Sequence, residues 1–135
     1  MTALSEVQFH IYPTDCDMLG HLNHATMLTF LERARWALLE PQLDLKSLTK
    51  QPAYSVVRHV DIGYLAQSLP GEDLVVRSGL LAVKNTSYIV RQEVRKVHDR
   101  TKVAEANIVF VAVDQNGQPV RVPDAWRNML PQWPE

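Results

Sequence analysis

The segment Tyr12–Trp36, YPTDCDMLGHLNHATMLTFLERARW, joins a cluster of reactive side chains to a long apolar pattern. From Met27 onward the apolar residues recur every three or four positions, which is the period of one face of an α-helix. Asn23 is the expected N-cap, because its side chain can accept hydrogen bonds from the free N–H groups of the first turn. Pro41 ends the pattern, since proline cannot continue a helix. The sequence therefore predicts one long helix over residues His24–Glu40.

The expected helix has a broad apolar stripe. A stripe of this kind must be buried against another element, so we expect the helix to pack against a sheet and to be largely covered. The stripe comprises Met27, Leu31, Ala34 and Leu38, widened by Leu28 and Phe30.

The rest of the chain is rich in β-branched and aromatic residues separated by turn residues, which indicates strands. Consecutive strands with tight turns form an antiparallel meander, and the last and most apolar strand is expected at its centre. The sequence therefore predicts an α+β fold, an antiparallel sheet wrapped around one long central helix, as a single domain over residues 1–135. The expected strands are Val7–Tyr12, Ala53–Leu65, Asp73–Val83, Thr86–Val97 and Val103–Val113, with a short helix in Val122–Leu130.

Charge and composition exclude several classes of function. The net charge is -1, with 14 Lys and Arg against 15 Asp and Glu, so the chain lacks the excess of positive charge that binds nucleic acid. No apolar run is long enough to cross a membrane, and the N-terminus lacks the pattern of a signal peptide. Cys16 is the only cysteine, which excludes an internal disulfide and favours a reducing compartment. We expect a cytoplasmic protein with neither a nucleic-acid nor a membrane partner.

Asp17 is the carboxylate best placed for chemistry. It precedes the expected helix, whose N-terminus offers free N–H donors and a partial positive charge that can stabilise an oxyanion. A carboxylate beside such a terminus can act on a carbonyl as general base or nucleophile. Gly20 allows the loop to bend and a ligand to approach the backbone. A cap or a solvated loop residue is the structural alternative for Asp17.

The same segment offers two other kinds of site, a reactive cysteine and a zinc site. Cys16 lies between Asp15 and Asp17, whose charges raise the pKa of a thiol and suppress the thiolate, so we interpret it as a packing residue. Asp17, His21 and His24 could ligate zinc with a water as fourth ligand, but the two histidines are not held on successive helical turns. We therefore expect no metal and no cofactor.

The segment TDCDMLGHLNHATMLTFLERAR resembles the signature of the hotdog-fold acyl-CoA thioesterases of the 4-hydroxybenzoyl-CoA thioesterase superfamily. The shared pattern is D-x-D-x-x-G-H-x-N, a helix, and then E-x-A-R. YLAQSLPGEDLVVRSGL and KNTSYIVRQEV resemble later strand–turn–strand pieces of the same family. The resemblance implies a hotdog fold and an enzyme that hydrolyses acyl-CoA to a carboxylic acid and coenzyme A.

The resemblance also implies roles for individual residues. The catalytic carboxylate falls on Asp17, and the backbone N–H that binds the oxyanion falls on His24. His21 and Asn23 match side chains that lie beside the thioester, and Met27 stands where many relatives carry tyrosine in the acyl pocket. Gly20 belongs to the same substrate-binding loop.

Coenzyme A carries phosphates, which need cations or backbone donors. The resemblance further implies a homodimer or homotetramer with active sites at the subunit junction. An acyl-ACP thioesterase, a non-catalytic acyl-thioester-binding module and a dehydratase of the same fold are the alternatives. The candidates for binding coenzyme A are Arg58, His59, Lys84, Asn85, Thr86 and Ser87.

Overall fold

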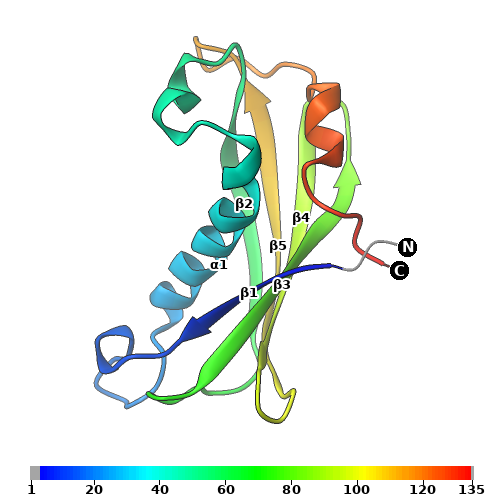
Figure 1. The fold of residues 1–135 in the computed structure, drawn as a ribbon. Helices are drawn as coiled ribbons and strands as arrows, with labels where there is room; N and C mark the ends of the chain where they lie inside the picture. The colour runs from blue at the N-terminus through cyan, green and yellow to red at the C-terminus, as the bar shows by residue number, and fades with distance from the viewer. Residues whose placement is uncertain (1–3, 135) are drawn as a thin grey trace.

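The computed structural model describes residues 4–134 as a five-stranded antiparallel sheet with one long helix on one of its faces (Figure 1). The predicted α+β class is confirmed; residues 1–3 and 135 of the predicted domain lie outside the described residues. The elements are β1 (Ser5–His10), η1 (Pro13–Asp15), α1 (His24–Leu39), η2 (Glu40–Gln42), η3 (Leu45–Lys50), β2 (Tyr54–Tyr64), β3 (Asp73–Val83), β4 (Ser87–Lys96), β5 (Lys102–Val113) and η4 (Asp124–Asn128), where η marks a short 3₁₀ helix.

The strand order corrects the predicted meander. The order across the sheet is β1-β3-β4-β5-β2, and every pairing is antiparallel. Strands β3, β4 and β5 do form a meander, and β5 is an interior strand as expected. The prediction was wrong for β2, which pairs with β5 rather than with β3. Consecutive strands need not pair when the segment between them is long enough to cross the end of the sheet.

The crossing segment, residues 65–72, runs along one end of the sheet. Leu65 N donates to Val103 O at the start of β5 (2.8 Å), and Gly71 N donates to Ile11 O beyond the end of β1 (2.7 Å). Gly71 has a φ of +92°, a conformation that glycine adopts without strain. The segment therefore passes from one side of the sheet to the other and closes the end at which α1 begins.

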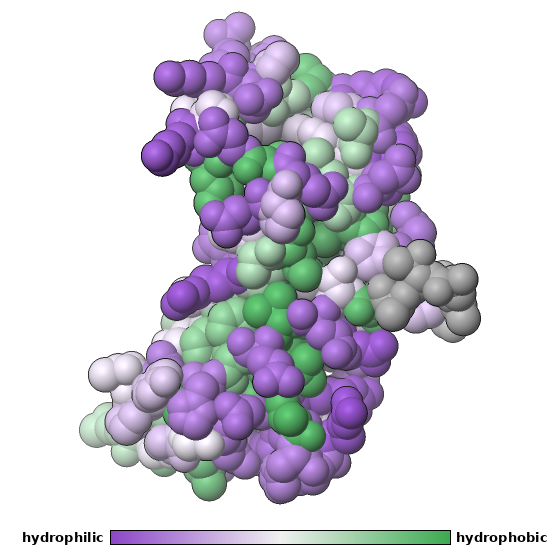
Figure 2. All heavy atoms as spheres, viewed as in Figure 1, coloured by the Kyte–Doolittle hydropathy of each residue, from purple (hydrophilic) through white to green (hydrophobic). Residues whose placement is uncertain are grey.

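Helix α1 packs across one face of the sheet: Phe30 stacks on Phe9 of β1, and Leu31 O accepts a hydrogen bond from Gln92 Nε2 of the central strand β4. Met27, Phe30, Leu31 and Ala34 are buried as the stripe predicts, but Leu28 is 38% exposed. The expectation of a largely covered helix was wrong, because the face of α1 opposite its buried stripe is exposed along its whole length. Figure 2 shows apolar residues gathered along the middle of this face, where α1 meets β1 and β3. None of the helices in residues 4–134 combines the length and the apolar character needed to cross a bilayer.

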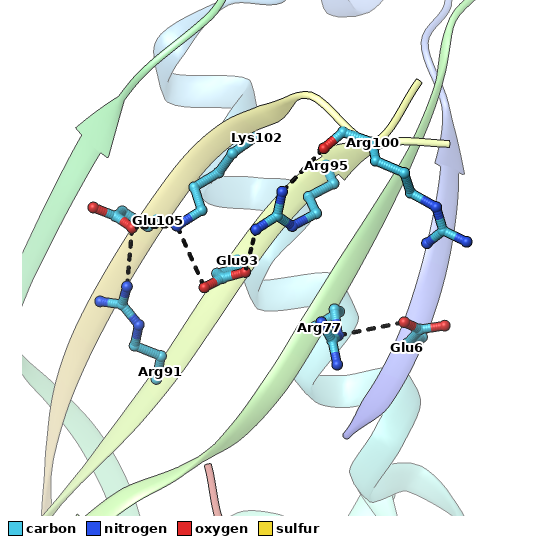
Figure 3. Close-up of polar contacts among 8 residues, drawn as sticks. All are labelled: Glu6, Arg77, Arg91, Glu93, Arg95, Arg100, Lys102 and Glu105. Atoms are coloured by element: carbon cyan, nitrogen blue, oxygen red, sulfur yellow. Dashed lines mark hydrogen bonds and ion pairs between the residues drawn. The ribbon is translucent and has the colours of Figure 1, made fainter. Parts of the chain in front are cut away.

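The face of the sheet opposite α1 carries acidic and basic side chains that form ion pairs between neighbouring strands (Figure 3). Arg91 contacts Glu105 at 2.9 Å, and Lys102 contacts both Glu105 and Glu93, at 3.0 and 3.5 Å. This confirms the alternation predicted for β4, with Val90 and Val94 buried and the charged residues on the outer face. Partly exposed ion pairs of this kind each contribute roughly 0–1 kcal/mol, so they add little to the stability of the fold.

Candidate active site

A tight loop before α1 holds the Asp17 carboxylate in place. Its Oδ1 accepts a hydrogen bond from Leu19 N at 3.0 Å, and its Oδ2 accepts one from Asn23 Nδ2 at 3.2 Å. Gly20 N donates to Asp17 O at 2.9 Å, and Gly20 has a φ of +85°. The loop therefore bends at Gly20 as predicted, and a side chain at this position would be strained.

Asn23 connects this carboxylate to the helix. Its Oδ1 accepts from Ala25 N at 2.8 Å and from Thr26 N at 3.3 Å, which confirms the predicted N-cap. In the part of the chain that the structure describes, the backbone N–H of His24 donates to no acceptor. A free N–H at a helix N-terminus is a ready donor to a developing negative charge.

A cavity of about 330 Å³ opens beside this helix N-terminus. The structure brings the predicted residues Asp17, His21, His24 and Met27 together in its wall, while Gly20 and Asn23, in the same loop, are not among the lining residues. The Asp17 carboxylate, the N-terminus of α1 and apolar side chains therefore line the same cavity. The other lining residues are Leu19, Leu22, Tyr64, Leu65, Ala66, Gln67, Ser68 and Val103.

The residues from β2 onward in this wall were missed by sequence reasoning. The Tyr64 hydroxyl donates a hydrogen bond to His24 O at 2.8 Å, and the rings of Tyr64 and His24 meet edge to face. Desolvation raises the pKa of the Tyr64 phenol, so this hydroxyl stays a donor at neutral pH. Ser68 is 2% exposed. The segment YLAQSLPGED reads as a strand end and a turn, and no local signal places it against the helix.

The residues predicted to bind coenzyme A lie away from this cavity. Ser87 pairs with Val111 near the end of β5, whereas the cavity lies at the beginning of that strand. Arg58 and His59 are exposed on β2, at a bulge in its pairing with β5. Lys84 and Asn85 are exposed in the β3–β4 turn, followed by half-buried Thr86 and Ser87. Their role in binding stays a prediction.

Cys16 is half-buried in the segment that precedes α1. Desolvation raises the pKa of its thiol, and the charges of Asp15 and Asp17 raise it further. The thiol is therefore kept protonated at neutral pH and is a poor nucleophile, as the sequence predicts.

We expect Cys16→Ser to retain activity within about threefold, because serine is close in size and the thiol takes no part in the proposed chemistry. Steady-state hydrolysis of one acyl-CoA checks this. A serine variant that folds normally by circular dichroism but has lost its activity would restore the cysteine as a reactive group.

No group of three or more His, Cys, Asp or Glu side chains within residues 4–134 is arranged to hold a metal ion. His21 Nδ1 lies 3.5 Å from Leu22 O, a distance at the limit of a hydrogen bond. The two histidines of the zinc alternative therefore do not converge with Asp17 on one point in this part of the chain.

Comparison with known proteins places the chain in a family. The sequence model of the thioesterase-like superfamily matches residues 11–130. The chain belongs to this superfamily. The predicted family is thereby confirmed, and so is the enzyme class, thioester hydrolase, at the level of the family.

Individual relatives agree with the family. The chain is 29% identical to the long-chain acyl-CoA thioesterase FadM of Escherichia coli, over 84% of this chain and 86% of that protein. It is 26% identical to the acyl-CoA thioester hydrolase YbgC of E. coli, over 84% of each chain. The crystal structure of YbaW, a probable thioesterase from E. coli, superposes with a TM-score of 0.82 at 26% identity, over 92% of this chain and 94% of that one. The predicted hotdog fold is confirmed.

Proposed function

We propose that the protein is an acyl-CoA thioesterase, which hydrolyses an acyl-CoA to a free carboxylic acid and coenzyme A. One observation carries the proposal: Asp17 shares a cavity with the free backbone N–H of His24 at the N-terminus of α1. The names of FadM and YbgC describe the same reaction for proteins of similar length.

The proposed chemistry uses the two features together. The thioester carbonyl oxygen accepts a hydrogen bond from His24 N–H, which stabilises the negative charge of the tetrahedral intermediate. Asp17 either accepts a proton from the attacking water or attacks the carbonyl itself to form an anhydride that water then opens. In both routes the C–S bond breaks, and the thiolate leaves as coenzyme A after it takes up a proton.

The test is hydrolysis of a panel of acyl-CoA esters of increasing chain length, with the released thiol measured. We expect saturable hydrolysis with a preference among chain lengths, because apolar residues, including Met27, Leu22 and Val103, line the cavity. The same acyl chains on acyl carrier protein are the comparison. Faster hydrolysis of the acyl carrier protein esters would make acyl carrier protein, rather than coenzyme A, the preferred carrier. Absence of hydrolysis throughout the panel would contradict the proposal.

The edge strand β2 supports a homodimer. Among the described residues β2 pairs only with β5, so its other edge is open over 11 residues. Val56, Val57 and Val60 on this strand are 40%, 50% and 38% exposed. A long apolar edge is a template for pairing with another strand. We therefore propose that two copies pair through β2, as a dimer or as the unit of a tetramer, in the cytoplasm.

Antiparallel pairing of the two β2 strands would also bring the predicted coenzyme A residues of one subunit to the same end of the joined sheet as the cavity of the other. Tyr54 pairs with Val113 and Tyr64 with Ala104, so the two ends of β2 lie at opposite ends of the sheet. A two-fold axis at the β2 edge brings the partner subunit's Lys84 to the end of the sheet where the cavity lies. The predicted phosphate-binding turn would then act across the interface.

We expect Val57→Lys to convert the dimer to a monomer, because it places a charge on the pairing edge. Molar mass measured by light scattering during size-exclusion chromatography checks this. Leu45→Lys, at an apolar position in η3 that is 41% exposed, is the matched control and should leave the mass unchanged. A Val57→Lys variant with the mass of the wild-type dimer would reject β2 as the interface.

A further inference from the structure

Tyr64 joins the sheet to the first turn of α1 in the wall of the cavity. Its hydroxyl donates a hydrogen bond to His24 O at 2.8 Å, and its ring meets the His24 imidazole edge to face, with the ring centroids 6.3 Å apart. Tyr64 is 47% exposed, and both residues line the cavity. The contact is therefore made to the same residue whose backbone N–H is assigned to the oxyanion.

Helix α1 does not need this hydrogen bond to complete its own backbone pairing. The groups that lack a partner at a helix N-terminus are the first N–H groups, whereas a carbonyl of the first turn accepts from the N–H four residues further on. A carbonyl oxygen has a second lone pair, and the Tyr64 hydroxyl is an additional donor to His24 O. The bond therefore adds a constraint on the first turn instead of satisfying an unpaired group of the helix.

The two peptide groups on either side of the His24 Cα are held by different parts of the chain. Asn23 holds the peptide that carries the His24 N–H, because Asn23 N donates to Asp15 O at 3.0 Å and the Asn23 side chain caps the first turn. Tyr64 holds the following peptide, to which His24 O belongs. Together the loop before α1 and strand β2 fix the direction in which the His24 N–H points.

Strand β2 gives Tyr64 a fixed backbone. Tyr64 pairs with Ala104 at the start of β5, and Leu65 N donates to Val103 O at 2.8 Å. A tyrosine has only two side-chain torsions, so little conformational entropy is lost when its hydroxyl is held. Because desolvation raises the pKa of the Tyr64 phenol, the hydroxyl keeps the proton that it donates. The hydroxyl therefore connects a fixed point of the sheet to the first turn of α1.

We propose that Tyr64, through its hydrogen bond to His24 O, holds the His24 N–H in the orientation that stabilises the oxyanion. A donor contributes most to the rate when it is already aimed at the place where negative charge develops. Tyr64 is thus a positioning residue, and the catalytic contact is made by His24. The inference rests on the proposed thioesterase function, because the oxyanion is the one that forms from the thioester.

The test is a double-mutant cycle of Tyr64→Phe and His24→Pro, with kcat and KM measured on one acyl-CoA. Tyr64→Phe keeps the ring and removes the hydroxyl. We expect kcat to fall about three- to tenfold, the effect of one neutral hydrogen bond, and KM to stay unchanged. In the His24→Pro background the donor is already absent, so the same change should lower kcat by no more than about twofold.

Tyr12→Phe is the matched control for the loss of a tyrosine hydroxyl. Tyr12 is 60% exposed in the segment before α1, and it is not among the residues that line the cavity. This variant should keep the kcat and KM of the wild type.

Three kinetic results would overturn the proposal. An unchanged kcat in Tyr64→Phe would make the hydroxyl dispensable. Equal fold losses in the wild-type and His24→Pro backgrounds would show that the hydroxyl acts independently of the His24 N–H. A higher KM with an unchanged kcat would make Tyr64 a group that binds the substrate.

If the wild type hydrolyses no acyl-CoA, the proposed function has failed, and the contact between Tyr64 and His24 is tested without substrate. The order parameter of the His24 amide, from ¹⁵N relaxation, reports how tightly this N–H is oriented. A lower value in Tyr64→Phe than in the wild type and Tyr12→Phe supports the positioning role, and equal values in the three proteins reject it. The same measurement decides the question if His24→Pro does not fold.

Discussion

Asp17→Asn is expected to lower kcat by about a hundredfold or more while the fold stays intact. The amide has nearly the shape of the carboxylate and can still accept from Leu19 N, which holds Asp17 Oδ1 at 3.0 Å. It can neither accept a proton from water nor attack a carbonyl. Steady-state release of thiol from one acyl-CoA measures the effect, and circular dichroism measures the fold.

Asp15→Asn is the matched control for this variant. Asp15 lies two residues away in the same loop, and its Oδ2 accepts a hydrogen bond from Tyr12 N at 2.9 Å. It is not among the residues that line the cavity. Its amide variant should keep most of the rate. Similar losses in the two variants would mean that loop geometry, rather than the Asp17 carboxylate, limits the reaction.

His24→Pro is expected to lower kcat by a hundred- to a thousandfold, whereas His24→Ala should keep most of the rate. Proline removes the backbone N–H, and one oxyanion donor is worth about 3–4 kcal/mol of transition-state stabilisation. Proline is tolerated in the first turn of a helix. The residue before it must be extended, and Asn23 already has φ -67° and ψ 140°.

The two His24 variants separate the contribution of the backbone N–H to the rate from that of the imidazole side chain. The carbonyl of His24, which accepts from the Tyr64 hydroxyl, is present in both variants. Both lose the imidazole, and only one loses the N–H. Kinetics on the same acyl-CoA, with far-ultraviolet circular dichroism to confirm helix content, provide the measurement. Equal rates would leave the helix N-terminus as a structural feature only.

The parts of the fold that follow from local chemistry could be predicted from the sequence. The N-cap at Asn23 and the end of α1 before Pro41 depend on residues within one helical turn. The boundaries of β3 and β5 are set by their own alternation and turns. The position of β2 depends on contacts across the sheet that no local pattern encodes, which is why the predicted meander was wrong there.

The same distinction applies to the candidate site. Asp17, His21, His24 and Met27 lie within eleven consecutive residues, and the structure places all four in one cavity wall. Tyr64 and residues 65–68 complete that wall only because the crossing segment folds against Leu22. The exposure of Leu28 likewise depends on how α1 is rotated on the sheet, which the helical period alone does not determine.

The central claim is that the loop carboxylate and the helix N-terminus hydrolyse acyl-CoA, and the most direct test counts thiol released per protein molecule. An excess of one acyl-CoA is incubated with the wild type and with Asp17→Asn, and free thiol is followed over time. The account predicts many equivalents of thiol from the wild type and release about a hundredfold slower or more from Asp17→Asn. Less than one equivalent from the wild type, or equal release by the two proteins, would contradict it.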